Sequence, residues 1–566
     1  MNNKVKITGL TLAVMSLSSL AFAAPSAQEI QGAIVQTNPG ANINQLKDYF
    51  DKARVEQDIE EGKKAAASQI ERQASQTETS ESTVKTFKLA GLNIDESRVL
   101  TAEELDSIKT SYVGKDVSVN DLYAIVDKIN TLYAIKGNFT CRAFLPQQKI
   151  EQGVVAVKLI EGTNGEALVT GNKHTRASYV KNRIAVARGE VPTLDKLNKD
   201  ILRFNATNDA QLRIVMNKGK EFGTTDYELK LTEPQNSVVT VFTDLAGNRN
   251  TGIWRGGLFY NLRSLTGNRD NLSLGYVGSE GTKSGSFAYS TPVNRMGTKV
   301  NVGYSANSVH SIRHKDEYRT FGHASTYNIG ISQPWVTTAK TRSEAFLEYS
   351  HQKSTSDFAF SGYRTKIVGD STNEISLGFS LVNYGKSHLI YQRHSLIHGN
   401  VDYDIRSNYT TTDSYNVYKG DALYQKVYQH GQQLTSRASL QKGFKDNIPS
   451  SRAFYIGGMN TVRGYYENFM AADSGFTLNV EYQMPISKDY KTKAYVFADY
   501  GHLFGENTQS ENVDRSLYSL GFGVKSSFAK NIYANLAFAF PLKRSFDGMS
   551  EDANRMRIHF ILTGQF

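Results

Sequence analysis

The chain has 566 residues and a formal charge of +10, and its single cysteine, Cys141, means that no disulfide can form within it. Its mean hydropathy is −0.43. Beyond residue 23, no stretch approaches the roughly 20 apolar residues of a spanning helix, which argues against a helical membrane protein. The basic residues are scattered rather than clustered, so the positive charge does not indicate a nucleic-acid partner. We expect Cys141 to be a small buried side chain without a redox role.

Residues 1–23 have the pattern of a secretory signal peptide. Lys4 and Lys6 precede a mostly apolar run, and small residues close that run before Ala24. We therefore expect residues 1–23 to be removed and the mature chain to begin near Ala24. An exported chain without a spanning helix is either a soluble secreted protein or a closed β-barrel, which is the other structure that satisfies its backbone hydrogen bonds within lipid. The abundance of Tyr and Phe over Trp favours the barrel.

Residues 24–60 are polar, and an amphipathic helix is predicted around residues 43–59. Pro39 and Gly40 should interrupt any single long helix in this region. Residues 61–83 read as a flexible linker, because they have too little apolar surface to offset the entropy cost of ordering. The region is either a disordered tail or a tethered helix that occupies and leaves another part of the protein.

Residues 84–162 and 163–235 read as two small α/β modules. The first is predicted to contain strands at 84–92, 139–145 and 154–160, with helices opening at Thr101 and spanning 121–135. The strand at 154–160 is apolar at nearly every position, so we expect it to be largely buried. The second module is predicted to contain strands at 167–170, 210–217 and 226–232 and a helix at 194–205. Neither module has a catalytic constellation, and we expect both to present a strand edge or groove to a polypeptide.

From residue 236 to residue 566 the pattern becomes alternating strands separated by Gly, Asn, Asp and Ser turns. At roughly 20 residues per strand and loop, this region predicts a transmembrane antiparallel β-barrel of about sixteen strands. The last strand shows the two-residue repeat: Ile558, Phe560, Leu562 and Phe566 share a face that can meet lipid, and His559, Thr563 and Gln565 share the other, with Ile561 the exception. A terminal Phe566 on such a strand resembles the signal by which outer-membrane barrels are recognised for assembly.

Two motifs stand in and after one long insertion, the predicted loop 443–473. The loop contains Val462-Arg463-Gly464-Tyr465, and the next strand but one carries Phe497-Ala498-Asp499-Tyr500-Gly501. In this order, just before a terminal barrel segment, they resemble the loop and Phe-x-Asp-x-Gly signatures of the two-partner secretion transporters, the TpsB family (FhaC/ShlB/CdiB-like), whose superfamily also includes barrel-assembly proteins.

The resemblance implies that the loop folds back into the barrel lumen and that Arg463 pairs with Asp499 on the wall. A planar guanidinium fits a carboxylate through two parallel hydrogen bonds, which Lys cannot reproduce. Gly464 would allow the tight backbone, and Tyr465 would pack against the wall. Because we expect the lumen to be wet, we predict that the pair fixes the position of the loop and contributes little to overall stability.

The two modules are similar to the POTRA domains of the same family. Residues 143–148 with 153–162 resemble the end of a first POTRA domain, and residues 219–229 resemble the closing segment of a second. Two POTRA domains favour export over membrane-protein insertion, and residues 24–60 resemble the family's N-terminal plug helix. The implied function is recognition and export of a large secreted exoprotein, namely an adhesin, a haemolysin or a contact-dependent inhibition toxin. The implied location is the Gram-negative outer membrane, with the POTRA domains in the periplasm and the barrel-assembly machinery as a partner during biogenesis.

Two alternatives are a barrel-assembly-type insertase of the same superfamily and a general porin or adhesin barrel. An enzyme is not predicted, because there is no nucleophile elbow and no metal-binding spacing such as H-E-x-x-H. His394 and His398 lie four residues apart, but in a strand-rich region this spacing makes no helical metal face, and we interpret them as lumen or loop side chains. No phosphate-binding loop is present, so we expect no nucleotide, metal or other cofactor, and the energy for export would come from folding of the cargo outside the cell.

Overall fold

The structure is a computed structural model, and it describes residues 38–45, 86–313, 318–360, 363–405, 409–444, 448–504, 515–529, 531–546 and 553–566. The predicted signal peptide (1–23) and linker (61–83) lie outside these residues, as does the predicted plug region (24–60) apart from 38–45. The chain divides into two compact units, residues 64–234 and residues 1–63 with 235–566. Among the described residues, no helix combines the length and apolar character needed to cross a membrane.

The first module of the 64–234 unit packs two helices on a small sheet. Its elements are β1 (Thr86–Lys88), β2 (Gly91–Ile94), α4 (Ala102–Tyr112), β3 (Asp116–Ser118), α5 (Val119–Ile135), β4 (Cys141–Phe144) and β5 (Val154–Glu161). The strand order is β2-β5-β4, and β1 pairs with β3 separately. Both helices begin with a capping box, made by Thr101 with Glu104 and by Ser118 with Asp121. These boxes satisfy amide groups that the first turn leaves unpaired.

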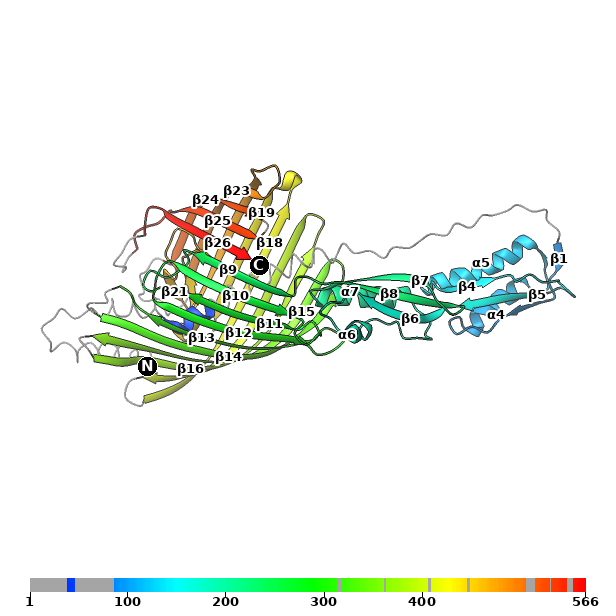
Figure 1. Cartoon of the computed structure of the whole chain (residues 1–566), viewed down its shortest axis with the longest axis horizontal. Helices are drawn as coiled ribbons and strands as arrows, with labels where there is room; N and C mark the ends of the chain where they lie inside the picture. The colour runs from blue at the N-terminus through cyan, green and yellow to red at the C-terminus, as the bar shows by residue number, and fades with distance from the viewer. Residues whose placement is uncertain are drawn as a thin grey trace. The chain divides into compact units, whose positions relative to one another are not determined.

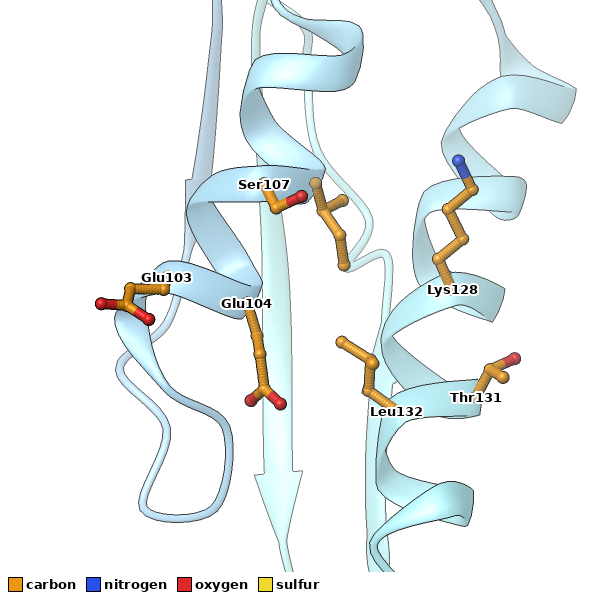
Figure 2. Close-up of a pocket in the computed structure, with 7 residues that line it drawn as sticks. Glu103, Glu104, Ser107, Lys128, Thr131 and Leu132 are labelled. Atoms are coloured by element: carbon orange, nitrogen blue, oxygen red, sulfur yellow. The ribbon is translucent and has the colours of Figure 1, made fainter.

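The strand predicted to be buried on both faces, β5, is buried on one face only. Val155 and Val157 are fully buried, whereas Val154 is 37% exposed. The helices cover one side of this sheet, so alternate side chains of β5 point away from the core. On the helical side, α4 and α5 lie next to each other (Figure 2). The hollow between them is lined by Glu103, Glu104, Ser107, Ile108, Lys128, Thr131 and Leu132.

The second module repeats this plan with a different helix arrangement. Its elements are β6 (Thr163–Thr170), α6 (Ala177–Lys181), α7 (Leu194–Thr207), β7 (Gln211–Lys218) and β8 (Thr224–Thr232), with strand order β6-β8-β7. Phe204 of α7 packs on Leu212 and Leu229 in its core. The sequence did not predict α6, which has only five residues and no side-chain cap. The modules are linked directly, since Gly162 alone separates β5 from β6.

The second unit is a closed antiparallel barrel of 16 strands, which confirms the predicted fold class (Figure 1). Its strands are β9 (Ser237–Asp244), β10 (Arg255–Arg263), β11 (Asn271–Gly278), β12 (Thr282–Pro292), β13 (Lys299–His310), β14 (Tyr318–Thr337), β15 (Thr341–Phe360), β16 (Tyr363–Tyr384), β17 (His388–Ile405), β18 (Tyr409–Val427), β19 (Gln433–Gly443), β22 (Ser474–Pro485), β23 (Thr492–Phe504), β24 (Ser516–Ala529), β25 (Ile532–Pro541) and β26 (Arg557–Gln565).

The barrel closes where β26 pairs with β9, in a register from Ile561 opposite Asp244 to Gln565 opposite Thr240. The terminal residue extends this seam. The backbone groups of Phe566 and Val239 exchange two N–H···O bonds, each 2.8 Å long. The side chain of Phe566 is 58% exposed. Phe566 thus helps to close the barrel, and its role as an assembly signal stays a prediction.

Side chains alternate between the two faces of the barrel wall, as the strand pleat requires. On β24, Leu520, Phe522 and Val524 are exposed on the outer face, whereas Ser519 points inward and is buried. An apolar outer band of this kind is what lipid contact demands. Inside, the wall presents polar side chains that a loop or a passing chain can contact.

His394 and His398 do not face the lumen and do not lie in a loop, so their interpretation was wrong. Both belong to β17 and share its outer face with Leu396, which is 57% exposed. The His394 ring lies 2.7 Å from the hydroxyl of Tyr418 and its centroid lies 5.0 Å from that of Phe379. Sequence could not assign this face, because Leu396 and Ile397 are both apolar and either parity fits the pattern.

Candidate functional site

The segment between β19 and β22 lies inside the barrel and is described from residue 448 onward. We call residues 448–473 the lumen loop. It contains the short helix η2 (Ser450–Arg452) and a two-stranded hairpin of β20 (Phe454–Ile456) and β21 (Met470–Ala472). Ile456, Val462 and Tyr465 of the loop are fully buried and pack with Leu503 and Leu517 of the wall. The sequence predicted a lumen loop here but not its hairpin.

The structure brings Arg463 of the loop onto Asp499 of β23. Arg463 Nε donates to Asp499 Oδ2 at 2.7 Å, and Arg463 Nη2 donates to Oδ1 at 2.8 Å. The backbone N–H of Arg463 adds a third bond to Oδ2 at 3.1 Å. This is the two-pronged geometry that a guanidinium and a carboxylate favour. The guanidinium carbon also lies 3.5 Å from the centroid of the Phe497 ring, so the aromatic residue of the wall motif stacks on the same group.

Three further polar side chains of the wall complete this cluster, and the sequence analysis missed them. Glu481 accepts from Arg463 Nη1 at 3.0 Å, and it also pairs with Lys525 of β24. Asn479 donates to Asp499 Oδ1 at 2.9 Å. Glu481 lies opposite Phe497, and Asn479 lies opposite Asp499, in the β22–β23 pairing. No motif marks these residues, because their positions depend on the register between strands.

The cluster is buried, which corrects the expectation that a wet lumen would weaken the pair. The side chain of Arg463 is 11% exposed, that of Glu481 9% and that of Asp499 0%. The lumen loop itself covers the charges that fix it and excludes water from them. Two positive and two negative groups balance here. Loss of one partner would leave a buried charge uncompensated, which costs far more than the loss of a surface pair.

The remaining motif residues shape the contact between loop and wall. Gly464 has a φ of +95°, a conformation that suits glycine. Its N–H donates to Nε2 of His559 on β26 at 2.9 Å. His559 faces inward, as predicted, but it is 2% exposed and serves as an acceptor for the loop. Gly501 of β23 faces Val462 of the loop. A Cβ at Gly501 would lie 2.8 Å from Val462 Cγ2, so the absence of a side chain there lets the loop approach β23.

Tyr465 anchors the loop to the wall on the other side of the motif. It is fully buried, and its hydroxyl donates to the backbone oxygens of Lys543 at 2.8 Å and Tyr518 at 3.1 Å. Its ring packs near Phe469 and Phe546. The loop motif therefore contacts the wall at β23, β24 and β26.

Residues 39–45 form a helical segment that contacts the lumen loop, and Figure 1 draws it in blue among the barrel strands. The helix starts at Pro39, with the Asn38 side chain accepting from the N–H of Ala41 at 2.9 Å. Asn38 is not helical, so the helix begins at the proline. Proline suits the first helical position, where no N–H partner is needed. Of the helix predicted at 43–59, only residues 43–45 lie within the described part of the chain.

Three hydrogen-bonded contacts connect this segment to the loop. Asn38 donates to Ser450 Oγ at 2.9 Å and Asn44 donates to the backbone oxygen of Ser451 at 2.8 Å. The amides of Gln45 and Asn468 bond reciprocally, at 2.6 and 2.9 Å. On the wall, Asn307 of β13 donates to the backbone oxygen of Pro39 at 2.9 Å. By hydrogen bonds, residues 38–45 are thus held by the loop at three points and by the wall at Asn307.

Comparison with known proteins gives this arrangement a family. Residues 223–526 match the family described as haemolysin secretion/activation protein ShlB/FhaC/HecB. Residues 87–162 match the POTRA domain of ShlB type.

The heme/hemopexin transporter protein HuxB of Haemophilus influenzae (strain 86-028NP) is 25% identical to the chain over 474 residues, which cover 79% of this chain and 82% of that protein. The outer membrane transporter CdiB of Escherichia coli O6:K15:H31 (strain 536 / UPEC) is 21% identical over 257 residues, covering 44% of this chain and 43% of CdiB.

Solved structures show the same fold. CdiB from Escherichia coli aligns with a TM-score of 0.64 at 16% identity and covers 96% of this chain and 100% of its own. CdiB from Acinetobacter baumannii gives the same score and identity, with 94% and 99% covered. The family resemblance predicted from the two motifs is confirmed. The chain belongs to the haemolysin secretion/activation family ShlB/FhaC/HecB, the two-partner secretion transporters of the outer membrane.

Proposed function

We propose that this transporter recognises one large partner exoprotein through its two modules and passes it through the barrel, which the lumen loop and residues 38–45 close at rest. The observation that carries the proposal is the buried cluster of Arg463, Lys525, Asp499 and Glu481, which fixes a segment of the protein in the path that a cargo would take. A barrel whose only task was passive diffusion would have no need to bury four charged side chains in holding such a loop.

The 64–234 unit supports the proposal for recognition, and we place it in the periplasm. Within the described residues, β2 and β4 are the outer strands of one three-stranded sheet, and β6 and β7 are the outer strands of the other. An outer strand leaves unpaired backbone groups, to which an extended polypeptide can add as a further strand. The secretion domain of an unfolded exoprotein fits this chemistry. The side chains on the strand faces would then provide specificity.

The class of cargo that we propose comes from the family. Two relatives named above are different transporters, the heme/hemopexin transporter HuxB and the outer membrane transporter CdiB. We therefore propose a large exoprotein, whether adhesin, haemolysin or contact-dependent inhibition toxin, without choosing among them. Folding of this cargo outside the cell would supply the energy for export.

The proposal is tested by deleting the gene and measuring which proteins change in abundance, both in the culture medium and in the purified outer membrane. We expect one large protein to disappear from the medium while the other barrels of the membrane keep their abundance. Depletion of many barrels would instead identify an insertase. Complementation with Arg463→Ala should restore the barrel in the membrane but not normal export. Normal export by this variant would argue for a porin or adhesin barrel.

A further inference from the structure

The lumen loop has a second charged attachment, far from the Arg463 cluster. Arg452, the last residue of η2, places Nη2 2.5 Å from Glu374 Oε2 on β16. The side chains are 13% and 6% exposed, so this ion pair is as buried as the first. Next to it, Ser451 Oγ donates to Asp370 of the same strand at 3.2 Å. The start of the loop is thus fixed to β16, whereas its motif is fixed to β22, β23 and β26.

The wall is built to hold Glu374 in place. Glu374 lies opposite Ser350 on one side and opposite Gly399 on the other. Tyr415, two strands away on β18, reaches across Gly399 and donates its hydroxyl to Glu374 Oε1 at 2.5 Å. A Cβ at Gly399 would lie 2.3 Å from the Tyr415 ring, so only glycine leaves room for this reach. Ser350 adds a bond to Oε2 at 3.2 Å.

This attachment adjoins the part of the loop that holds the helical segment. Ser450 and Ser451, which accept the bonds from Asn38 and Asn44, immediately precede Arg452 in η2. Ile43, on the same helical segment, is 4% exposed. Movement of η2 away from β16 would therefore remove two of the three contacts between residues 38–45 and the loop. It would leave the Arg463 cluster in place.

We propose that Arg452, Glu374 and Tyr415 form a second anchor of the lumen loop, which positions η2 as the seat of residues 38–45 and thereby controls how often that segment leaves the lumen. Arg452 and its partners are positioning residues, acting on the helical segment through Ser450 and Ser451. The inference rests on the proposed role of residues 38–45 as the plug. It adds that η2 can separate from β16 while the Arg463 cluster keeps the loop motif on the wall.

The position of the segment can be measured on the purified full chain in lipid vesicles, without any cargo. In a Cys141→Ala background, Ile43→Cys provides one thiol, and a polyethylene-glycol maleimide reports its exposure. If opening is fast relative to labelling, the labelling rate follows the population in which the segment has left its seat. Loss of a charge-assisted hydrogen bond changes such a population about tenfold or more.

We expect Glu374→Gln to raise the labelling rate of the thiol at position 43 about tenfold or more, and Tyr415→Phe, which keeps the ring, to raise it less. Combining Glu374→Gln with Arg452→Gln should raise the labelling rate no further than Glu374→Gln alone, because both groups act through one contact and the double variant leaves no unpaired charge. The matched control is Asp357→Asn, which breaks the 2.6 Å pair with Arg364 of β16, whose side chain is 50% exposed. It should label at the parental rate.

Unchanged labelling in Glu374→Gln and Tyr415→Phe, both folded as heat-modifiable barrels, would overturn the proposal. An increase in Asp357→Asn as large as in Glu374→Gln would also overturn it, because the effect would then be general loosening of the barrel. If only the anchor variants change the labelling rate, the anchor is supported even when deletion of the gene removes no exoprotein from the medium. Failure of the proposed function and failure of this inference therefore give different results.

Discussion

Removing the guanidinium of Arg463 should release the motif of the lumen loop from the barrel wall. In Arg463→Ala, Asp499 and Glu481 would face a single cation, Lys525, and the fully buried Asp499 would lose its two strongest donors. Breaking a buried ion pair in this way costs about 3–5 kcal/mol. The cost has an upper limit, because the loop can lift away and let water reach Asp499. Even a cost of about 3 kcal/mol lowers the ratio of seated to released loop by a factor of roughly 10².

The assay uses Val462→Cys, since Val462 belongs to the loop and is fully buried between it and the wall. In the Cys141→Ala background, maleimide labelling of the thiol at position 462 should accelerate about a hundredfold in Arg463→Ala. Arg463→Lys should also accelerate it, because an ammonium cannot reproduce the two parallel bonds. The double variant Arg463→Met with Asp499→Asn should label more slowly than Arg463→Ala, since it leaves no unpaired buried charge and keeps Glu481 paired with Lys525.

The order of these rates is what tests the reasoning. If Arg463→Lys labels like the parent protein, the two-pronged geometry is irrelevant to the position of the loop. If the double variant labels faster than Arg463→Ala, the cost does not come from an uncompensated charge, and the buried-pair argument is refuted.

Three further outcomes follow from other contacts. Gly501→Ala should displace Val462 and weaken loop seating by about 1–3 kcal/mol, which should raise the frequency of channel openings in planar bilayers. Gly285→Ala, whose Cβ would meet nothing within 4 Å, should leave that frequency unchanged. Tyr465→Phe removes the donor to two backbone oxygens and should raise the frequency of channel openings in planar bilayers, with the same barrel fold. Burial works to raise the pKa of Glu161, but hydrogen bonds from Ser97, the Arg98 N–H and Tyr133 hold that pKa below its usual value. Glu161 therefore stabilises the first module at neutral pH, and this contribution is lost as the pH falls. In Glu161→Gln, the stability against urea should be lower at pH 7 and should decline less steeply toward acid pH.

The sequence by itself determined the features that depend on local pattern. The alternation in the last strand correctly predicted that Ile558 faces outward and His559 inward, because parity on a strand is a local property. Thr101, which was predicted to open a helix, caps α4, where a local hydrogen bond to the first turn stabilises the helix. The two motifs indicated Arg463 and Asp499 because a resemblance carries residue types in a fixed order.

Only the tertiary structure decided what surrounds these residues. Glu481 and Lys525 join Arg463 through the registers of β22, β23 and β24, which no local pattern fixes. Arg452 meets Glu374 across the lumen, although the two residues stand far apart in the chain. The dryness of the Arg463 cluster also comes from the fold, since the loop that the charges hold is the cover that excludes water from them. Burial and long-range pairing are properties of the closed barrel, so sequence could name the arginine and the aspartate but not the environment that gives their contact its strength.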